Sequence, residues 1–230
     1  MLSKDHFVLS IFSDFILFSW LFFQNPFFFF AITFGVFIGC LLPDTDLPKS
    51  RIDYLKGITG FFVFITKNFI NPLVAIIFEF VLKKPIDRGH RGITHTIYGI
   101  LTYCLIIEGI GLLLFFVLRT GGFITGYSLF VFGLFFGGML HLMEDSCTKS
   151  GITPFYPLNG DKKYSGNVST FNLKEKRPVY YAILLLILSV FLLIVQIFSD
   201  FPIGVIIFLS VVSFLIAWKI ITTMSKVTRN

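Results

Sequence analysis

Long apolar runs separated by short polar turns dominate the hydrophobic pattern of this chain of 230 residues. A helix that crosses the hydrocarbon core of a bilayer needs about 20 apolar residues, and somewhat fewer where the bilayer is thin. Six segments meet this requirement: 7–23, 27–42, 95–118, 127–147, 178–198 and 202–222. The pattern therefore predicts an all-α, polytopic helical membrane protein with about six transmembrane helices.

Short turn signals divide the first pair and the last pair of apolar runs. Residues Gln24 to Pro26 interrupt the first pair, and Ser199 to Pro202 interrupt the last. We therefore expect two tight helical hairpins, the second of them a C-terminal hairpin over 178–222. Because no internal repeat or low-complexity linker is present, the sequence predicts a single membrane-embedded domain over residues 1–230.

A seventh apolar stretch, 58–82, is long enough to span but has an unusual content of polar and helix-breaking residues. These are Lys67, Asn68, Asn71, Pro72 and Glu79. Asn68, Asn71, Ala75 and Glu79 share one stripe at helical spacing. A broken polar helix is costly in lipid, so an in-plane amphipathic or re-entrant segment is the favoured interpretation.

Charge asymmetry supports this topology. If 58–82 does not cross, Arg119 is the only one of the 19 Lys and Arg residues in a loop on the second side, and Lys67 lies within the ambiguous stretch. The other basic residues lie at or near the first side, which the positive-inside rule assigns to the cytoplasm. We therefore expect a multi-pass protein of the inner (cytoplasmic) membrane with both termini cytoplasmic.

Composition excludes a soluble protein. Hydrophobic residues make up 55% of the chain and charged residues only 14%, and the mean hydropathy is +0.85. The net charge of +6 is scattered through loops rather than gathered in a dense patch. We attribute it to topology and to contact with membrane lipid, and expect no nucleic-acid partner. The three cysteines are widely spaced and predict no disulfide framework. Oligomeric state is left open.

The four histidines, His6, His90, His95 and His141, all fall at the predicted cytoplasmic ends of helices or in the loop before them. Carboxylates accompany them. Asp44 and Asp46 emerge where an apolar run ends, and Asp145 follows His141 by four residues, on the same helix face. Polar groups gathered at the margin of so apolar a protein indicate a metal site.

Other polar residues are candidates for roles beside the ligands. Asp14 lies two turns beyond His6 on the same face, where it would either accept a hydrogen bond from a ligand histidine or pack as a neutral side chain. Thr94 is a candidate helix cap beside His95. Arg91 suits an oxyanion because its guanidinium is a planar fork, although a positive-inside charge explains it equally well.

Several motifs in fixed order make the sequence resemble the YdjM-like family of inner-membrane, metal-dependent hydrolases, also described as LexA-binding membrane hydrolases. The matching elements are His6 before an apolar helix, the stretch Leu42 to Ser50, the segment His90 to His95, the helix end Gly137 to Gly151, and the pair Tyr156 and Pro157. The resemblance covers mainly residues 1–160. Leu47 departs from the family pattern, which often has histidine there, so no ligand is expected at that position.

The resemblance implies a hydrolase with metal ligands His6, Asp44, Asp46, His95, His141 and Asp145, and with His90 as a further candidate. Six or seven imidazole and carboxylate ligands exceed what one tetrahedral ion takes. We therefore expect two divalent ions, Zn²⁺ or Mn²⁺, bridged by an aspartate. Asp44, His95 and Arg91 are the expected catalytic residues, and Asp14, Thr94 and Thr148 are expected to support the ligands from behind.

The expected reaction is hydrolysis by metal-activated water, with a phosphoester of a lipid or a membrane-associated substrate as the favoured target. The alternative is a non-catalytic membrane regulator or scaffold whose metal is structural. A metal transporter fits less well, because the ligands lie at one face rather than near the midplane. The sequence contains no serine nucleophile elbow, zincin motif or phosphate-binding glycine loop.

Overall fold

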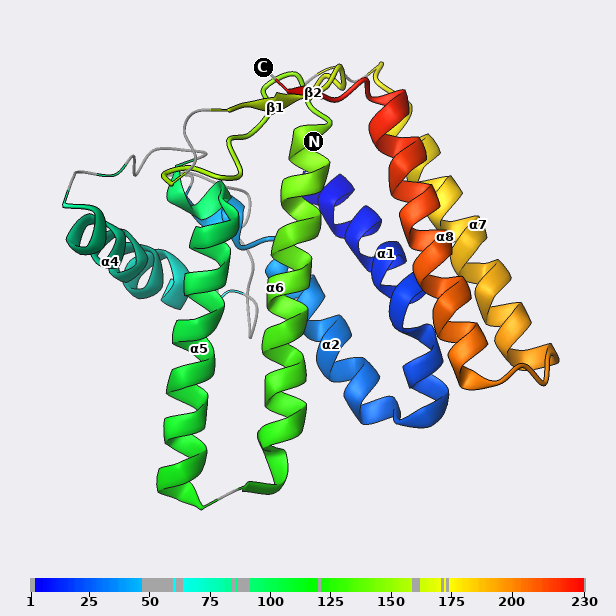
Figure 1. Ribbon diagram of the computed structural model, residues 1–230, viewed down its shortest axis with the longest axis horizontal. Helices are drawn as coiled ribbons and strands as arrows, with labels where there is room; N and C mark the ends of the chain where they lie inside the picture. The colour runs from blue at the N-terminus through cyan, green and yellow to red at the C-terminus, as the bar shows by residue number, and fades with distance from the viewer. Residues whose placement is uncertain are drawn as a thin grey trace.

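The computed structural model of the chain describes residues 3–46, 60, 64–83, 86, 92–119, 121–158, 162–170, 172 and 174–229, and for Ser3 and Asp46 the backbone alone. Seven α-helices form in this part of the chain: α1 (Ser3–Gln24), α2 (Pro26–Gly39), α4 (Asn71–Leu82), α5 (Ile97–Leu118), α6 (Ile124–Ser146), α7 (Arg177–Phe198) and α8 (Ile203–Met224) (Figure 1). Two short strands, β1 (Tyr164–Ser165) and β2 (Thr228–Arg229), pair antiparallel. The predicted all-α class is confirmed.

Five of the helices are long and apolar enough to cross a membrane, namely α1, α5, α6, α7 and α8. The sixth predicted span, 27–42, corresponds to α2, which has only 14 residues. At about 1.5 Å per residue it is about 21 Å long, shorter than a hydrocarbon core of about 30 Å. The helix ends early because the chain turns at Cys40 into the 3-10 turn η1 (Pro43–Asp46). The prediction of about six spans is thus confirmed for five.

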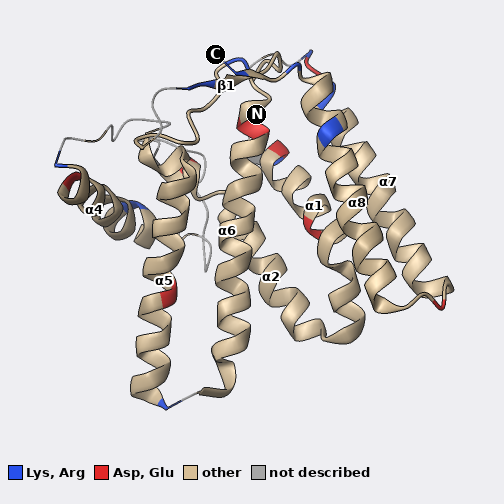
Figure 2. Ribbon diagram, in the orientation of Figure 1, with Lys and Arg blue, Asp and Glu red and all other residues tan. Residues whose placement is uncertain are grey.

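Both chain termini lie at the same end of the bundle, together with the β ribbon (Figure 1). We call this the N/C end. The 3-10 turn η4 (Ile93–His95), which precedes α5, also lies there. Lys and Arg gather at the N/C end, whereas the opposite tips of the helices carry few charges (Figure 2). Arg119 is the one basic residue in the described loops at the opposite end.

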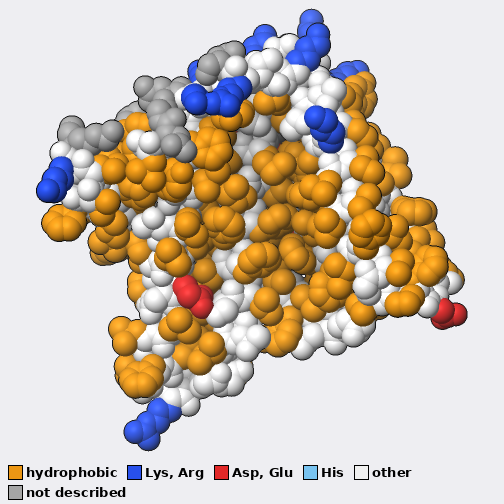
Figure 3. Space-filling view, viewed as in Figure 1, with side chains coloured by type: hydrophobic (Ala, Val, Ile, Leu, Met, Phe, Trp, Pro, Cys, Tyr) orange, Lys and Arg blue, Asp and Glu red, His pale blue; other side chains and the backbone are white. Residues whose placement is uncertain are grey.

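Apolar side chains cover the sides of the bundle between its two ends (Figure 3). Phe116 on α5 and Phe198 on α7 are 82% and 83% exposed, and many other large apolar residues of α5, α7 and α8 are exposed as well. In water such a surface would be an aggregation site, whereas lipid accommodates it without cost. The exposed apolar belt therefore marks the part of the bundle that lies in the membrane.

The stretch 58–82 is described at Gly60 and from Phe64 onward, where it forms the π-helical turn η3 (Thr66–Ile70) followed by α4. With 12 residues, α4 is too short to cross a bilayer. It runs across the direction of α5 rather than alongside it (Figure 1). Its placement in the plane of the membrane stays a prediction.

The closest helix contact joins α2 to α6 through glycines spaced four residues apart. A Cβ atom added at Gly35 would lie 2.1 Å from the Phe130 carbonyl oxygen, and one at Gly39 would lie 2.2 Å from the Leu134 oxygen. Gly133 and Gly137 of α6 meet the backbone of α2 equally closely. The two backbones thus touch directly, in the small-xxx-small arrangement that membrane helices use. This contact fixes α2 on the last turns of α6.

The C-terminal hairpin is fastened at the N/C end by polar contacts. The hydroxyls of Tyr181 and Ser225 lie 2.8 Å apart, and Arg177 donates to the Asn167 carbonyl at 2.7 Å. Hydrogen bonds from Arg177 lower the pKa of Glu175 to about 2. This pair therefore stays charged throughout the physiological pH range.

A direct test of the α2–α6 contact is Gly35→Ala, because the new methyl group would overlap the Phe130 carbonyl. We expect the free energy of unfolding in detergent to fall by about 1–3 kcal/mol. Gly109→Ala on α5 is the matched control, since a Cβ there meets nothing within 4 Å. Thermal unfolding would check both, and equal midpoints for the two variants would contradict the contact.

Topology can be tested with single cysteines introduced in a cysteine-free background. We expect Lys83→Cys and Lys162→Cys, both exposed, to react with an impermeant reagent from the same side of the membrane, and Arg119→Cys from the other. Labelling in right-side-out and inverted vesicles distinguishes the two sides. Lys4→Cys, exposed and located before this stretch, provides the comparison, and its reaction from the side opposite to Lys83→Cys would mean that the 58–82 stretch crosses.

Candidate metal centre

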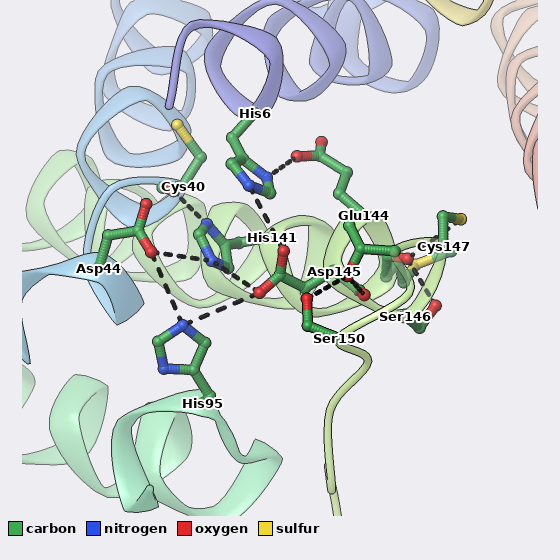
Figure 4. Close-up of polar contacts among 12 residues, drawn as sticks. His6, Cys40, Asp44, His95, His141, Glu144, Asp145, Ser146, Cys147 and Ser150 are labelled. Carbon is green, nitrogen blue, oxygen red and sulfur yellow. Dashed lines mark hydrogen bonds and ion pairs between the residues drawn. The ribbon is translucent and has the colours of Figure 1, made fainter. Parts of the chain in front are cut away.

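The last turns of α6 provide two groups of the site. His141 and Asp145 lie one helical turn apart and point the same way, as predicted from their spacing (Figure 4). Both side chains are buried. They lie one turn and two turns beyond Gly137, which packs on the α2 backbone. The contact between α2 and α6 thus brings the end of α2 against the ligands.

A backbone carbonyl orients the His141 ring. Its Nδ1 lies 2.8 Å from the carbonyl oxygen of Cys40, the residue that ends α2. A carbonyl at a helix end has no partner within the helix, so it is available to accept this hydrogen bond. The imidazole Nδ1 must then carry the proton, which leaves a lone pair on Nε2. That Nε2 atom is buried and has no hydrogen-bond partner among the described residues.

The lone pair on His141 Nε2 belongs to a cluster of four possible metal-ligand atoms. His141 Nε2 lies 3.7 Å from Asp44 Oδ1 and 3.9 Å from Asp145 Oδ2. His95 Nε2 lies 3.7 Å from the same Asp44 atom and 4.0 Å from the same Asp145 atom (Figure 4). Ligands at about 2.0–2.2 Å from a tetrahedral ion are about 3.3–3.6 Å apart, so each of these four distances is slightly longer than the spacing of ligands on one ion. We call these four residues the tetrad.

His6 of α1 approaches the tetrad from the other side. Its Nε2 lies 3.6 Å from Asp145 Oδ1, so the two oxygens of this carboxylate face different histidines. Its ring stacks on His141 with centroids 4.1 Å apart. His6 Nδ1 lies 2.5 Å from Glu144 Oε2, and the Ser10 hydroxyl donates to Glu144 Oε1 at 3.0 Å. A carboxylate thus fixes the ring and leaves its Nε2 directed at the cluster.

Two buried triads of His and Asp can bind metal ions in this part of the structure. One combines His6, Asp44 and His141, and the other His95, His141 and Asp145. Asp44 is the most exposed of these groups, with 15% of its side chain accessible. Burial raises the pKa of Asp44, but the neighbouring His141 and His95 rings outweigh it and hold that pKa well below its usual range. Asp44 is therefore an ionised carboxylate.

The structure brings together five of the predicted ligands: His6, Asp44, His95, His141 and Asp145. The Asp46 backbone belongs to η1, but its side chain lies outside the described residues, as do His90 and Arg91. The assignments of those three residues stay predictions.

Of the two threonines predicted to support the ligands, Thr94 contacts a ligand histidine, whereas Thr148 contacts only the backbone of Asp145. Thr96, not Thr94, caps α5 by accepting from the Gly99 amide, so the cap prediction for Thr94 was wrong. The Thr94 hydroxyl instead lies 3.3 Å from His95 Nδ1. Thr148 donates to the Asp145 carbonyl at 2.7 Å and thus fastens the end of α6 without contacting the carboxylate of that residue.

Glu144 occupies the role for which Asp14 was the candidate. Asp14 accepts from the Thr33 hydroxyl at 2.7 Å, and its other oxygen has no hydrogen-bond partner among the described residues, so it does not support a ligand histidine. One pattern in the sequence could have identified Glu144 as the partner of His6. Ser10 follows His6 by four residues on the same helix face, and Glu144 adjoins Asp145.

Comparison with known proteins identifies the family of this chain. A sequence model of the YdjM inner membrane protein family matches residues 1–225. The chain belongs to this family. The match extends the predicted YdjM resemblance from residues 1–160 over the C-terminal hairpin. No curated protein and no solved structure matches the chain. Family membership and five long apolar helices together make this YdjM protein a multi-pass inner membrane protein.

The hydrogen bond from His6 to Glu144 yields a prediction for metal binding. We expect Glu144→Gln to weaken binding of Zn²⁺ or Mn²⁺ by about 10- to 100-fold, because an amide holds and polarises the ring less well. His141→Ala should abolish tight binding, since it removes a group common to both triads. Metal analysis and titration of the purified proteins check this.

Glu175→Gln is the matched control, because Glu175 is a carboxylate paired with Arg177 far along the chain from the ligands. Metal affinity should be unchanged there. Unaltered metal affinity in both Glu144→Gln and His141→Ala would rule the site out.

Proposed function

We propose that this YdjM-family protein is a metal-dependent hydrolase that cleaves a phosphoester of a lipid or membrane-associated substrate at the cytoplasmic face. One observation carries the proposal. The ring nitrogens of three histidines and the oxygens of two aspartates converge within a buried cluster, in a chain whose long helices expose mainly apolar side chains. Ionisable groups at such positions are costly and are retained in membrane proteins for function.

The geometry favours two ions over one. His141 belongs to both triads, but its Nδ1 is committed to the Cys40 carbonyl, so its single remaining nitrogen can bind one ion only. That ion belongs with the tetrad. His6 and Asp145 would hold a second ion, so that Asp145 would serve both ions. Zn²⁺ and Mn²⁺ both suit this mixture of imidazole and carboxylate.

When bound, such a metal pair supplies an activated water and stabilises charge on a phosphoryl oxygen. The residues of the chain orient the metal ligands, admit the substrate and exclude bulk water. Glu144 and the Cys40 carbonyl hold two imidazoles in the tautomer that presents Nε2. Asp44 stands at the accessible edge of the cluster, where a substrate would enter. The buried walls exclude bulk water and strengthen the electrostatic interactions inside.

Location favours a substrate held by the membrane. The site lies at the N/C end, where Lys and Arg gather and the apolar belt stops (Figures 2 and 3). By the positive-inside rule this end is cytoplasmic. A phosphoester in a lipid headgroup occupies the same depth. A transport pathway is disfavoured, since the ligands cluster at one end of the bundle rather than at its middle.

The proposal predicts metal-dependent phosphate release. Purified protein loaded with Zn²⁺ or Mn²⁺ should hydrolyse at least one lipid phosphoester from a headgroup panel, and a chelator should stop the reaction reversibly. Asp145→Asn should lower the rate at least about 100-fold, because it removes a ligand and the proposed bridge. Asp200→Asn, an exposed carboxylate at the opposite end, should retain full activity.

Lipid profiles of cells that express wild-type protein or His95→Ala would identify the accumulating substrate. A metal-loaded protein that hydrolyses no member of the panel, combined with unchanged lipid profiles, would contradict the proposal. That outcome would favour a membrane regulator with a structural metal.

A further inference from the structure

An open groove of about 740 Å³ lies at the end of the bundle opposite to the metal centre, where α5 turns back into α6 (Figure 1). Its lining includes Leu112, Phe115 and Phe116 of α5, Ile124 of α6, and Arg119 from the turn between the two helices. Ligand pockets measure roughly 300–1,000 Å³, so this groove is large enough to hold part of a lipid molecule.

The walls of the groove suit an acyl chain. Apart from Arg119, its described lining residues are apolar side chains or glycine. Phe116 is 82% exposed and Leu112 is 41% exposed. The seven residues from Leu112 to Arg119 extend for about 10 Å along the axis of α5. A hydrocarbon chain packs against such a wall without leaving a polar group unpaired.

Arg119 gives the groove a positive charge at its outer end. Its side chain is exposed, and no carboxylate is among the described lining residues. Glu108 precedes it by 11 residues, which is about 16 Å along a helix axis. Asp200 lies across the bundle, in the turn between α7 and α8 (Figure 2). The planar guanidinium carries five N–H donors, which match the oxygens of a phosphate group.

The depth of Arg119 also matches a phosphate group. Arg119 directly follows Leu118, the last residue of α5, so it lies where the exposed apolar belt ends. The phosphates of that leaflet begin at the same level, and a long basic side chain reaches them readily. A cation at the end of a helix is favourable in itself, but that interaction does not require a groove.

A second copy of the chain fits the groove less well than a lipid does. A two-fold contact centred on the groove would bring the two Arg119 side chains together, because such a contact pairs the same surface on both copies. Like charges in a membrane environment repel strongly. An anionic lipid supplies the opposite charge and the apolar chain in one molecule.

We propose that this groove is a binding site for an anionic phospholipid of the leaflet opposite to the metal centre. Arg119 contacts the phosphate, and the wall formed by Leu112, Phe115 and Phe116 contacts an acyl chain. The inference is independent of the proposed hydrolase activity, because no residue of the metal centre lines the groove.

Tryptophan fluorescence can report on lipid at this groove alone. Trp20 and Trp218 are the two tryptophans of the chain, and both would be replaced by phenylalanine before Phe116→Trp is introduced as the reporter. In vesicles, lipids with brominated acyl chains quench a tryptophan that they contact. We expect brominated phosphatidylglycerol to bind about three- to tenfold more strongly than brominated phosphatidylcholine, because a basic residue at the headgroup level favours an anionic lipid.

Phe198→Trp provides the matched control reporter. Phe198 ends α7, is 83% exposed, and precedes Asp200 by two residues. We expect no preference for the anionic lipid there, since the nearby charge is negative. With the Phe116→Trp reporter, Arg119→Gln should bring the two lipids within about twofold of each other, whereas Arg119→Lys should retain most of the preference because the charge remains.

Two results would overturn the inference. One is equal affinity of the two lipids at the Phe116→Trp reporter while Arg119 is present. The other is a preference for the anionic lipid that persists in Arg119→Gln. Light scattering in detergent tests the competing occupant: a dimer that becomes monomeric in both Arg119→Gln and Asp200→Asn would assign Arg119 to a second copy and reject the lipid site.

Discussion

The direct contact of the α2 and α6 backbones is the constraint on which the site depends. Glycines at Gly35, Gly39, Gly133 and Gly137 let the two helices approach until main-chain atoms touch. Only at that separation does the last carbonyl of α2, at Cys40, reach the His141 ring. The same approach delivers the turn that carries Asp44 to the end of α6. A packing motif that contains no reactive group therefore determines the geometry of the reactive ones.

The cluster is assembled at considerable energetic cost. His6, His95, His141, Glu144 and Asp145 all have 2% or less of their surface exposed. Burial of imidazoles and carboxylates is unfavourable unless they are paired, and the hydrogen bonds to Glu144 and Cys40 satisfy only one side of two rings. A cation would satisfy the other side. The arrangement is thus preorganised, because the rings already hold the orientation that an ion requires.

Much of the architecture followed from the sequence because its signals are local. Apolar length identifies the five long helices, and the four-residue spacing alone places His141 beside Asp145. Helix counting also placed His6, Asp44 and His95 at the same end.

Other features depend on contacts between distant segments. Glu144 is marked in the sequence only by its place beside Asp145, and its pairing with His6 depends on the packing of α1 against α6. Lys67 appeared to be an unfavourable interruption of an apolar run, and only the fold shows that it lines a cavity beside the metal site. The end of α2 likewise depends on tertiary structure, because its apolar run contains no signal that the helix ends at Gly39.

The shortness of α2 has a consequence for the surrounding bilayer. A helix of 14 residues falls about 9 Å short of a typical hydrocarbon core, while α1 and α6, between which it packs, are long enough to span. Lipids beside it face a hydrophobic mismatch, and the least costly response is local thinning. The headgroup layer then dips at the end of α2, toward Asp44. The protein would thereby draw the polar surface of the membrane down to its metal ligands rather than lift a lipid out to reach them.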